Sequence, residues 1–246
     1  EEQGNLADAI RSLEQVTRLA PDYARAYLHR GFLFARNTEL GGALEEWQKA
    51  YELDPHLDNL FTDPSTAALY KRRIDEALQA FERPLLLNPN DGFAHLQMGR
   101  ANRFFGRPEL ALQNLKKSID INPRLWEAFD QAGQIYAELG QNKQAIMYLQ
   151  RAVEANPRFA ESHFQLGMIY DQENMMVPAL KQLERALELE PTNPRFLSAN
   201  GKVLMKAGRF KPAMMQFQKS LDADPKNADV YFQLARCCKE IYRPDL

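Results

Sequence analysis

Seven prolines recur along the chain at a constant interval of 34 residues. They are Pro21, Pro55, Pro89, Pro123, Pro157, Pro191 and Pro225. Glycines share this period at positions 99, 133, 167 and 201, and in a second phase at 106, 140 and 208, while alanines share it at 9, 43, 77, 111, 145, 179 and 213. A fixed period of this size is typical of a repeat architecture, in which each unit is one supersecondary structure.

Each unit is predicted to form two helices. Apolar residues recur with 3.6-residue spacing in 126–139 and again in 143–155, and Pro157 ends the second helix. The mid-helix Gly133 costs about 1 kcal/mol relative to alanine. Its recurrence in successive units predicts a close approach of the two helices, opposite the small Ala145. Such a hairpin cannot bury its apolar stripe alone, so it must stack on its neighbours.

The 34-residue pattern resembles the tetratricopeptide repeat. In residues 160–193 the matching positions are Leu166, Gly167, Tyr170, Ala179, Leu183 and Pro191. The resemblance covers the whole chain and implies an all-α fold, a right-handed superhelical solenoid of antiparallel helix pairs. It says little about function, because such repeats are binding scaffolds with many unrelated partners.

The period extends over the whole chain, so residues 1–246 are predicted to form a single array of repeats. We expect a half repeat at 1–23, full repeats at 24–57, 58–91, 92–125, 126–159, 160–193 and 194–227, and a half repeat at 228–246. A terminal repeat needs a polar outer face. The apolar stripe of 228–241 is therefore expected to be covered by following chain, or by self-association through the incomplete terminal repeats.

Repeat 58–91 departs from the pattern. It contains no glycine, with Ser65 and Arg72 at the two usual glycine positions, and it carries two additional prolines, Pro64 and Pro84. It is either a degenerate repeat, tolerated because its second helix keeps its apolar residues, or a local break that opens a pocket or hinge.

The two prolines predict where the helices of this repeat begin and end. We expect the first helix to start late, with Asp63 as N-cap and Pro64 as first residue. Pro84 has no N–H to donate to the carbonyl of Ala80, so the second helix should kink or end early.

The composition excludes several classes of partner. The chain has 31 basic and 33 acidic residues, which gives no reason to expect nucleic-acid binding. No apolar run approaches the ~20 residues of a membrane span, so we expect no membrane insertion. The two cysteines, Cys237 and Cys238, are adjacent and rarely bridge in that arrangement. Their burial and a reducing compartment, such as the cytoplasm, are favoured.

Catalytic and metal-binding motifs are missing from the sequence. His95 and His163 occupy the same repeat position two units apart, so they lie on the order of 20 Å from each other and are predicted to pack between helices. No phosphate-binding loop, dinucleotide fingerprint or CxxC pair is present. We therefore predict no enzyme, no metal and no cofactor.

In the tetratricopeptide family the first helix of each repeat lines a concave groove, with its second, fifth, sixth, ninth, twelfth and thirteenth positions facing inward. The resemblance places glutamines at the sixth position: Gln97, Gln131, Gln165 and Gln233, interrupted by Ala199. An amide donates and accepts, which matches a peptide backbone of any sequence. This resembles the asparagine ladder of O-linked N-acetylglucosamine transferases, although a polar amide is also common at this position in such repeats generally.

Charged and apolar residues accompany the glutamines. The expected binding set is Gln97, Arg100, Arg103, Glu127, Asp130, Gln131, Gln134, Phe164, Gln165, Met168, Lys202, Gln233 and Arg236. Basic residues come first along the chain, then acidic ones, and then basic ones again. This zoning predicts a charge-matched ligand, and the alternative is an ordinary solvated surface.

The lysine and asparagine that clamp chaperone C-termini in some family members are absent from the matching positions, for example Phe164 and Met168. The leading hypothesis is a scaffold that binds a protein or extended peptide in the groove. The alternative is a targeting or regulatory repeat segment of a larger enzyme, such as a glycosyltransferase.

Overall fold

The structure, a computed structural model, describes residues 2–54, 56–57 and 64–241. Within these ranges it contains thirteen helices and no strand, which confirms the predicted all-α class. The chain forms two compact units, Glu1–Ala128 (unit 1) and Phe129–Leu246 (unit 2). The boundary between them falls inside α8 (Trp126–Glu138).

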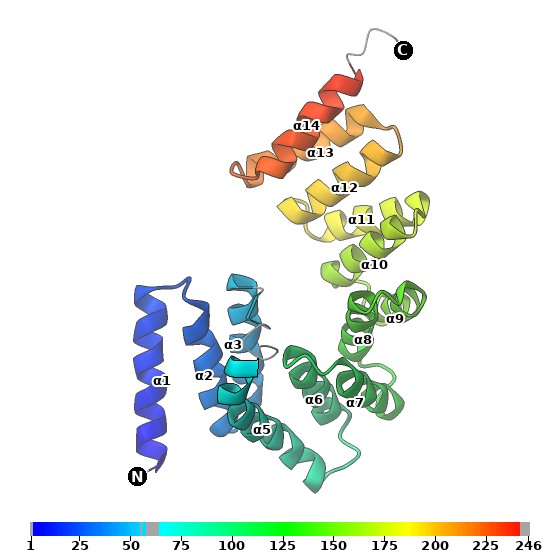
Figure 1. Ribbon diagram of the computed structural model, residues 1–246. Coiled ribbons are helices and arrows are strands. Elements are labelled where there is room, and N and C mark those ends of the chain that lie inside the picture. Colours follow the sequence, from blue (N-terminus) through cyan, green and yellow to red (C-terminus); the bar gives the residue numbers. More distant parts are fainter. Residues whose placement is uncertain (1, 55, 58–63, 242–246) are drawn as a thin grey trace. The chain divides into compact units, whose positions relative to one another are not determined.

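The helix boundaries follow the period of the sequence. Unit 1 contains α1 (Glu2–Leu19), α2 (Ala24–Arg36), α3 (Leu40–Leu53), α5 (Pro64–Leu87), α6 (Gly92–Phe104) and α7 (Pro108–Ile121). Unit 2 contains α9 (Asn142–Ala155), α10 (Ala160–Gln172), α11 (Met176–Leu189), α12 (Pro194–Lys206), α13 (Phe210–Ala223) and α14 (Ala228–Ile241). Helices α6, α8, α10, α12 and α14 begin 34 residues apart, as do α7, α9, α11 and α13. Within each unit, consecutive helices pack as antiparallel pairs (Figure 1).

The turn inside each pair contains one residue with a left-handed backbone. It is a glycine at Gly106, Gly140 and Gly208, with φ of 66°, 69° and 73°. Asn174 and Thr38 take the equivalent place with φ of 59° and 63°. Glycine adopts this conformation without steric cost, and asparagine tolerates it better than most residues. The second set of periodic glycines therefore marks the turns.

The mid-helix glycines lie where two helices of a pair meet, as predicted. A Cβ on Gly133 would lie 2.6 Å from Cγ of Leu149, and a Cβ on Gly167 would lie 2.9 Å from Cγ of Leu183. The side chain that faces each glycine is thus a large one, four residues after the alanine expected there. In the pair α2–α3 of unit 1 the same place is taken by Trp47, whose ring a Cβ on Gly31 would meet.

Trp47 is also the centre of the core of unit 1. Its side chain is fully buried, and its ring centroid lies 5.6 Å from that of Phe32, 6.0 Å from Phe81 and 4.9 Å from Phe105. These rings come from α2, α3, α5 and the end of α6. The aromatic cluster therefore holds α5 in the unit although its repeat lacks the usual pattern.

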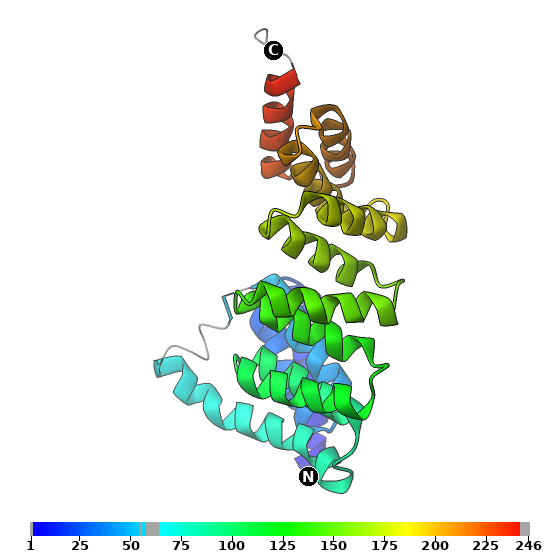
Figure 2. The same ribbon diagram turned by 90° about the vertical axis from the view of Figure 1, so that its right-hand side faces the viewer.

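Repeat 58–91 differs from the prediction of two helices. Its described part is one uninterrupted helix of 24 residues, α5, which Figure 2 shows in cyan. The helix begins at Pro64 as predicted, while Asp63, the predicted N-cap, lies outside the described residues. Arg72 stands at the turn position but is helical, and its Nε lies 2.8 Å from a carboxylate oxygen of Glu76 one turn later. Because no residue there adopts a left-handed backbone, the helix continues.

Pro84 lies inside α5 and does not end it, so the predicted early end is wrong. The helix continues to Leu87, and the carbonyl of Pro84 accepts a hydrogen bond from the backbone N–H of Asn88 at 2.9 Å. Pro84 stands in the last turn, where its missing N–H removes only one bond before the helix ends. The predicted apolar stripe is buried as expected at Ile74 and Phe81.

Candidate partner-binding site

The predicted binding residues lie on the first helices of the pairs. They are Gln97, Arg100 and Arg103 on α6, Glu127, Asp130, Gln131 and Gln134 on α8, Phe164, Gln165 and Met168 on α10, Lys202 on α12, and Gln233 and Arg236 on α14. The two units divide this set, and the interactions within each unit decide which groups remain available to a partner.

Two of the glutamines at the sixth position, Gln165 and Gln233, donate to a carboxylate one turn earlier. In unit 2 the Nε2 atom of Gln165 lies 2.7 Å from Oε1 of Glu161, and Nε2 of Gln233 lies 3.2 Å from Oδ1 of Asp229. One of the two N–H groups of each amide is thereby engaged, which leaves a second N–H and the amide oxygen. For Gln165 this oxygen has no partner among the described residues, so it remains an acceptor. Gln165 therefore keeps an acceptor and a second donor, whereas Oε1 of Gln233 already accepts from Nη1 of Arg236 at 3.2 Å.

Ion pairs join successive first helices of unit 2. Arg195 contacts Glu161 at 3.3 Å, and Lys202 contacts Asp229 at 2.7 Å. Hydrogen bonds from Lys202 and Gln233 lower the pKa of Asp229. The acidic and basic zones of the sequence therefore meet in ion pairs between neighbouring helices.

A further ion pair lies at the other ends of the same helices. The Nζ atom of Lys206 on α12 lies 2.5 Å from Oδ2 of Asp171 on α10. Asp171 is buried, and its Oδ1 has no hydrogen-bond partner among the described residues. Lys206 thus compensates a carboxylate that is withdrawn from solvent.

Asp130 is buried rather than exposed to a ligand. Its side chain is 3% exposed and accepts from the hydroxyl of Ser162 at 2.5 Å and from Nε2 of Gln134 at 2.7 Å. Ser162 belongs to α10, the first helix of the next repeat. The bond from Ser162 gives Asp130 a role in holding neighbouring repeats together, while Gln134 belongs to the same helix as Asp130.

Phe164 is also covered. Its ring stacks on Phe196 with centroids 4.7 Å apart, and the guanidinium carbon of Arg195 lies 4.9 Å from its centroid. Phe232 of α14 is by contrast 62% exposed, with Arg236 lying 6.0 Å from its centroid. On the first helices of unit 2, Phe232 and the half-buried Met168 therefore offer apolar surface that Phe164 does not.

In unit 1 the predicted residues are partly withdrawn from solvent. Burial lowers the pKa of Arg100, opposed by the charges of Glu45 and Glu127. Gln97 is buried, and its Oε1 atom has no partner among the described residues. Oε2 of Glu127 is likewise buried without a partner there.

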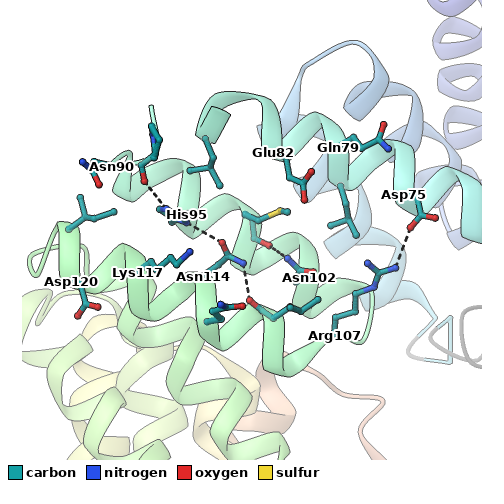
Figure 3. Close-up of a pocket in the computed structure, with 17 residues that line it drawn as sticks. Asp75, Gln79, Glu82, Asn90, His95, Asn102, Arg107, Asn114, Lys117 and Asp120 are labelled. Carbon is teal, nitrogen blue, oxygen red and sulfur yellow. Dashed lines mark hydrogen bonds and ion pairs between the residues drawn. The ribbon is translucent and has the colours of Figure 1, made fainter. Parts of the chain in front are cut away.

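Unit 1 contains a hollow that the sequence analysis did not predict. It lies on the side of the second helices. Figure 3 shows it between α5 and α7, with α6 as its floor. Its volume is about 940 Å³. At one end Arg107 contacts Asp75 at 3.5 Å. One signal was present in the sequence: Gln79 and Gln113, on opposite walls, are 34 residues apart and so occupy the same repeat position.

The histidines have the predicted packing role. In His95, Nε2 lies 3.0 Å from the carbonyl oxygen of Pro89 and Nδ1 lies 3.1 Å from Oδ1 of Asn114. His163 makes the equivalent contacts with Pro157 and Gln182 at 3.2 and 2.7 Å. Each ring thus joins the loop before a pair to its second helix.

The described part of the chain contains no cluster of three His, Cys, Asp or Glu residues that could hold a metal ion. In the same part, every helix is too short or too polar to cross a bilayer.

Models of the tetratricopeptide repeat match the chain at residues 1–58, 133–173, 160–193 and 216–245. No curated protein gives a significant match. Among solved structures, MamA is 25% identical with a TM-score of 0.59, over 68% of this chain and 97% of MamA. YrrB, described as a TPR protein with an unusual peptide-binding site, is 21% identical with a TM-score of 0.55, over 92% of this chain and 97% of YrrB.

TTC0263, a thermophilic TPR protein of Thermus thermophilus, is 30% identical with a TM-score of 0.51. The match covers 74% of this chain and 98% of that protein. Proteins built from such repeats are generally non-enzymatic scaffolds for protein interactions. From the repeat matches in both units and this relative, the chain belongs to the tetratricopeptide-repeat family.

Proposed function

We propose that the chain is a protein-interaction scaffold whose first-helix face binds an extended segment of a partner protein. Family membership supports the scaffold role. The binding face is supported by one observation, the orientation of the glutamine at the sixth position of α10. Gln165 donates through Nε2 to Glu161 at 2.7 Å and keeps its oxygen as an acceptor.

This orientation leaves the oxygen of Gln165 available to a partner. One N–H of the amide is held by the carboxylate, and a partner can use the oxygen by donating a hydrogen bond to it. The backbone N–H groups of an extended segment do so whatever their sequence, and a lysine or arginine side chain does so with charge. The half-buried Met168, one turn after Gln165, adds apolar contact. Adaptable methionine surfaces suit partners of varied shape.

The first experiment identifies the partner by affinity capture with the intact chain, followed by mass spectrometry. Affinity for the captured protein is then measured with Gln131 and Gln165 changed together to alanine. Each lost hydrogen bond is worth ~0.5–1.5 kcal/mol, so binding should weaken by roughly tenfold. Unfolding free energy should change little, because both side chains are only half buried.

The control variant changes Gln141 and Gln144 to alanine. Both side chains are exposed and lie at the start of α9, on the second-helix side. Its affinity should equal that of the wild type. Equal affinity in both double variants would place the partner elsewhere and refute binding at the first-helix face.

A further inference from the structure

The hollow between α5 and α7 is built as a groove with two parallel walls. Asp75 and Arg107 close one end, while Asn90 and Asp120 lie at the other, so both helices run in the same direction along it (Figure 3). The floor is formed by buried side chains of α6, among them Met98. From Asp75 to Leu85, the α5 wall is about 15 Å long at 1.5 Å per residue.

Several polar groups on the walls have no partner among the described residues. They include the amides of Gln79 on α5 and Gln113 on α7, both exposed. Asn114 is different, because its Nδ2 donates to the carbonyl of Leu110 at 2.9 Å and its Oδ1 faces His95. The groove therefore offers donors and acceptors on both sides that no intramolecular contact uses.

The unpaired amides on the walls favour an extended occupant over a helix. A helix satisfies its own backbone hydrogen bonds and would leave both amides unused. An extended segment advances about 3.3 Å per residue, so four or five residues fill the length. Its unpaired N–H and C=O groups match the amides of Gln79 and Gln113.

The side chains around the amides define the chemistry of the segment. Leu110 and Ile121 of α7 are 46% and 38% exposed at the groove and can take apolar side chains. The carboxylates of Glu82 and Asp120 and the ammonium of Lys117 have no ion-pair partner among the described residues. Because Asp75 and Arg107 neutralise each other, the remaining groups leave one net negative charge.

We propose that this groove is a second peptide-binding site, which takes a short extended segment with apolar side chains and a basic residue opposite Glu82. The site lies on the second helices, so it goes beyond the proposed binding at the first helices. A partner can occupy one site without the other.

The test uses an acetylated and amidated pentapeptide, Ala-Leu-Arg-Leu-Ala, and its counterpart with glutamate in place of arginine. Binding to the isotope-labelled intact chain is followed by amide chemical shifts at up to millimolar peptide. The arginine peptide should shift resonances of α5, α6 and α7. Glu82→Lys should weaken its binding by about five- to tenfold, as expected for reversal of an exposed charge, and should strengthen binding of the glutamate peptide.

The matched control is Glu184→Lys on α11. Glu184 occupies the same repeat position as Glu82 and is also exposed. Its substitution should leave the binding of both peptides unchanged. Changing Gln79 and Gln113 together to alanine should weaken both peptides about equally, because the amides contact backbone. No shifts in α5 to α7, or an equal response to Glu82→Lys and Glu184→Lys, would overturn the proposal. Shifts confined to first helices of unit 2 would also overturn it, while supporting the proposed function.

Discussion

Repeats 58–91 and 160–193 have the same length and share their apolar stripe, yet their backbones differ. In the second, α10 ends at Gln172, Asn174 adopts φ of 59°, and α11 begins at Met176. In the first, α5 passes through the equivalent residue, Arg72, without interruption. The apolar stripe thus determines which face is buried, and a single turn residue determines whether the chain forms one helix or two.

The two repeats also differ in how they are held in place. In 160–193 the helices meet at Gly167, where the glycine leaves room for Leu183. In 58–91 the described part of α5 is held by rings, with Phe81 against Trp47 and Tyr70 stacked at 6.2 Å on Phe32. Close backbone approach is therefore needed where a hairpin packs on itself, while a single helix depends on the aromatic core of its unit.

The largest effect should come from removing the side chain that fills the hairpin. Leu183→Ala deletes a fully buried side chain, which typically costs 2–5 kcal/mol. Urea denaturation followed by circular dichroism gives the change in unfolding free energy. Glu184→Ala, an exposed neighbour on α11, is the control and should change it little. A loss below about 1 kcal/mol for Leu183→Ala would mean that the hairpin is not held by this contact.

The next effect separates close packing from helix propensity. Gly167→Ala would place a Cβ 2.9 Å from Cγ of the buried Leu183, and overpacking of this kind costs about 1–3 kcal/mol. Gly41→Ala in α3 meets nothing within 4 Å and should gain up to about 1 kcal/mol from propensity. Both are measured by urea denaturation. If both substitutions raise the unfolding free energy by similar amounts, Gly167 is not needed for the close approach of α10 and α11.

The sequence predicted the period, the helix pairs and the close approach because each follows from local spacing. Gly167 and the apolar stripe of α10 can be interpreted within one repeat. Three of the turn residues belong to the second set of periodic glycines, whereas Thr38 shows that a residue other than glycine or asparagine can adopt φ of 63°.

The sequence did not predict interactions between repeats. The contact of Ser162 with Asp130 and the ion pair of Lys202 with Asp229 join residues from adjacent repeats. Their formation depends on how one helix lies on the next, which the period alone does not specify. For the same reason the zoned charges were interpreted as ligand contacts, and the groove beside α5 was missed.

A smaller effect tests the turn position directly. Arg72→Gly should lower the unfolding free energy by about 1 kcal/mol through helix propensity, together with the lost contact to Glu76. Asn174→Ala should cost a similar ~1 kcal/mol, because alanine is strained in the left-handed conformation. Hydrogen exchange should show faster opening around residue 72 in Arg72→Gly. Stabilisation by Arg72→Gly would instead mean that repeat 58–91 prefers a hairpin.

The smallest effect is pH-dependent and concerns the contact of α5 with α2. Nδ1 of His29 lies 2.8 Å from Nη1 of Arg73, which can only donate, so the ring must accept in its neutral form. Burial, followed by the charges of Arg73 and Arg25, lowers the pKa of His29 below its ordinary 6.5. His163 in the regular pair α10–α11 differs from His29, because both of its ring nitrogens face oxygen atoms and neither faces an arginine.

The sign of the effect follows from proton binding. Between the lowered folded pKa of His29 and its unfolded value, the unfolded chain binds more protons, so stability rises with pH through this window and is lost as pH falls below about 6.5. Thermal unfolding at about pH 7.5 and about pH 5.5 should therefore differ more in the wild type than in His29→Gln. His56→Gln, at an exposed ring, should keep the wild-type difference. If His29→Gln keeps it too, protonation of His29 does not weaken the packing of α5 on α2.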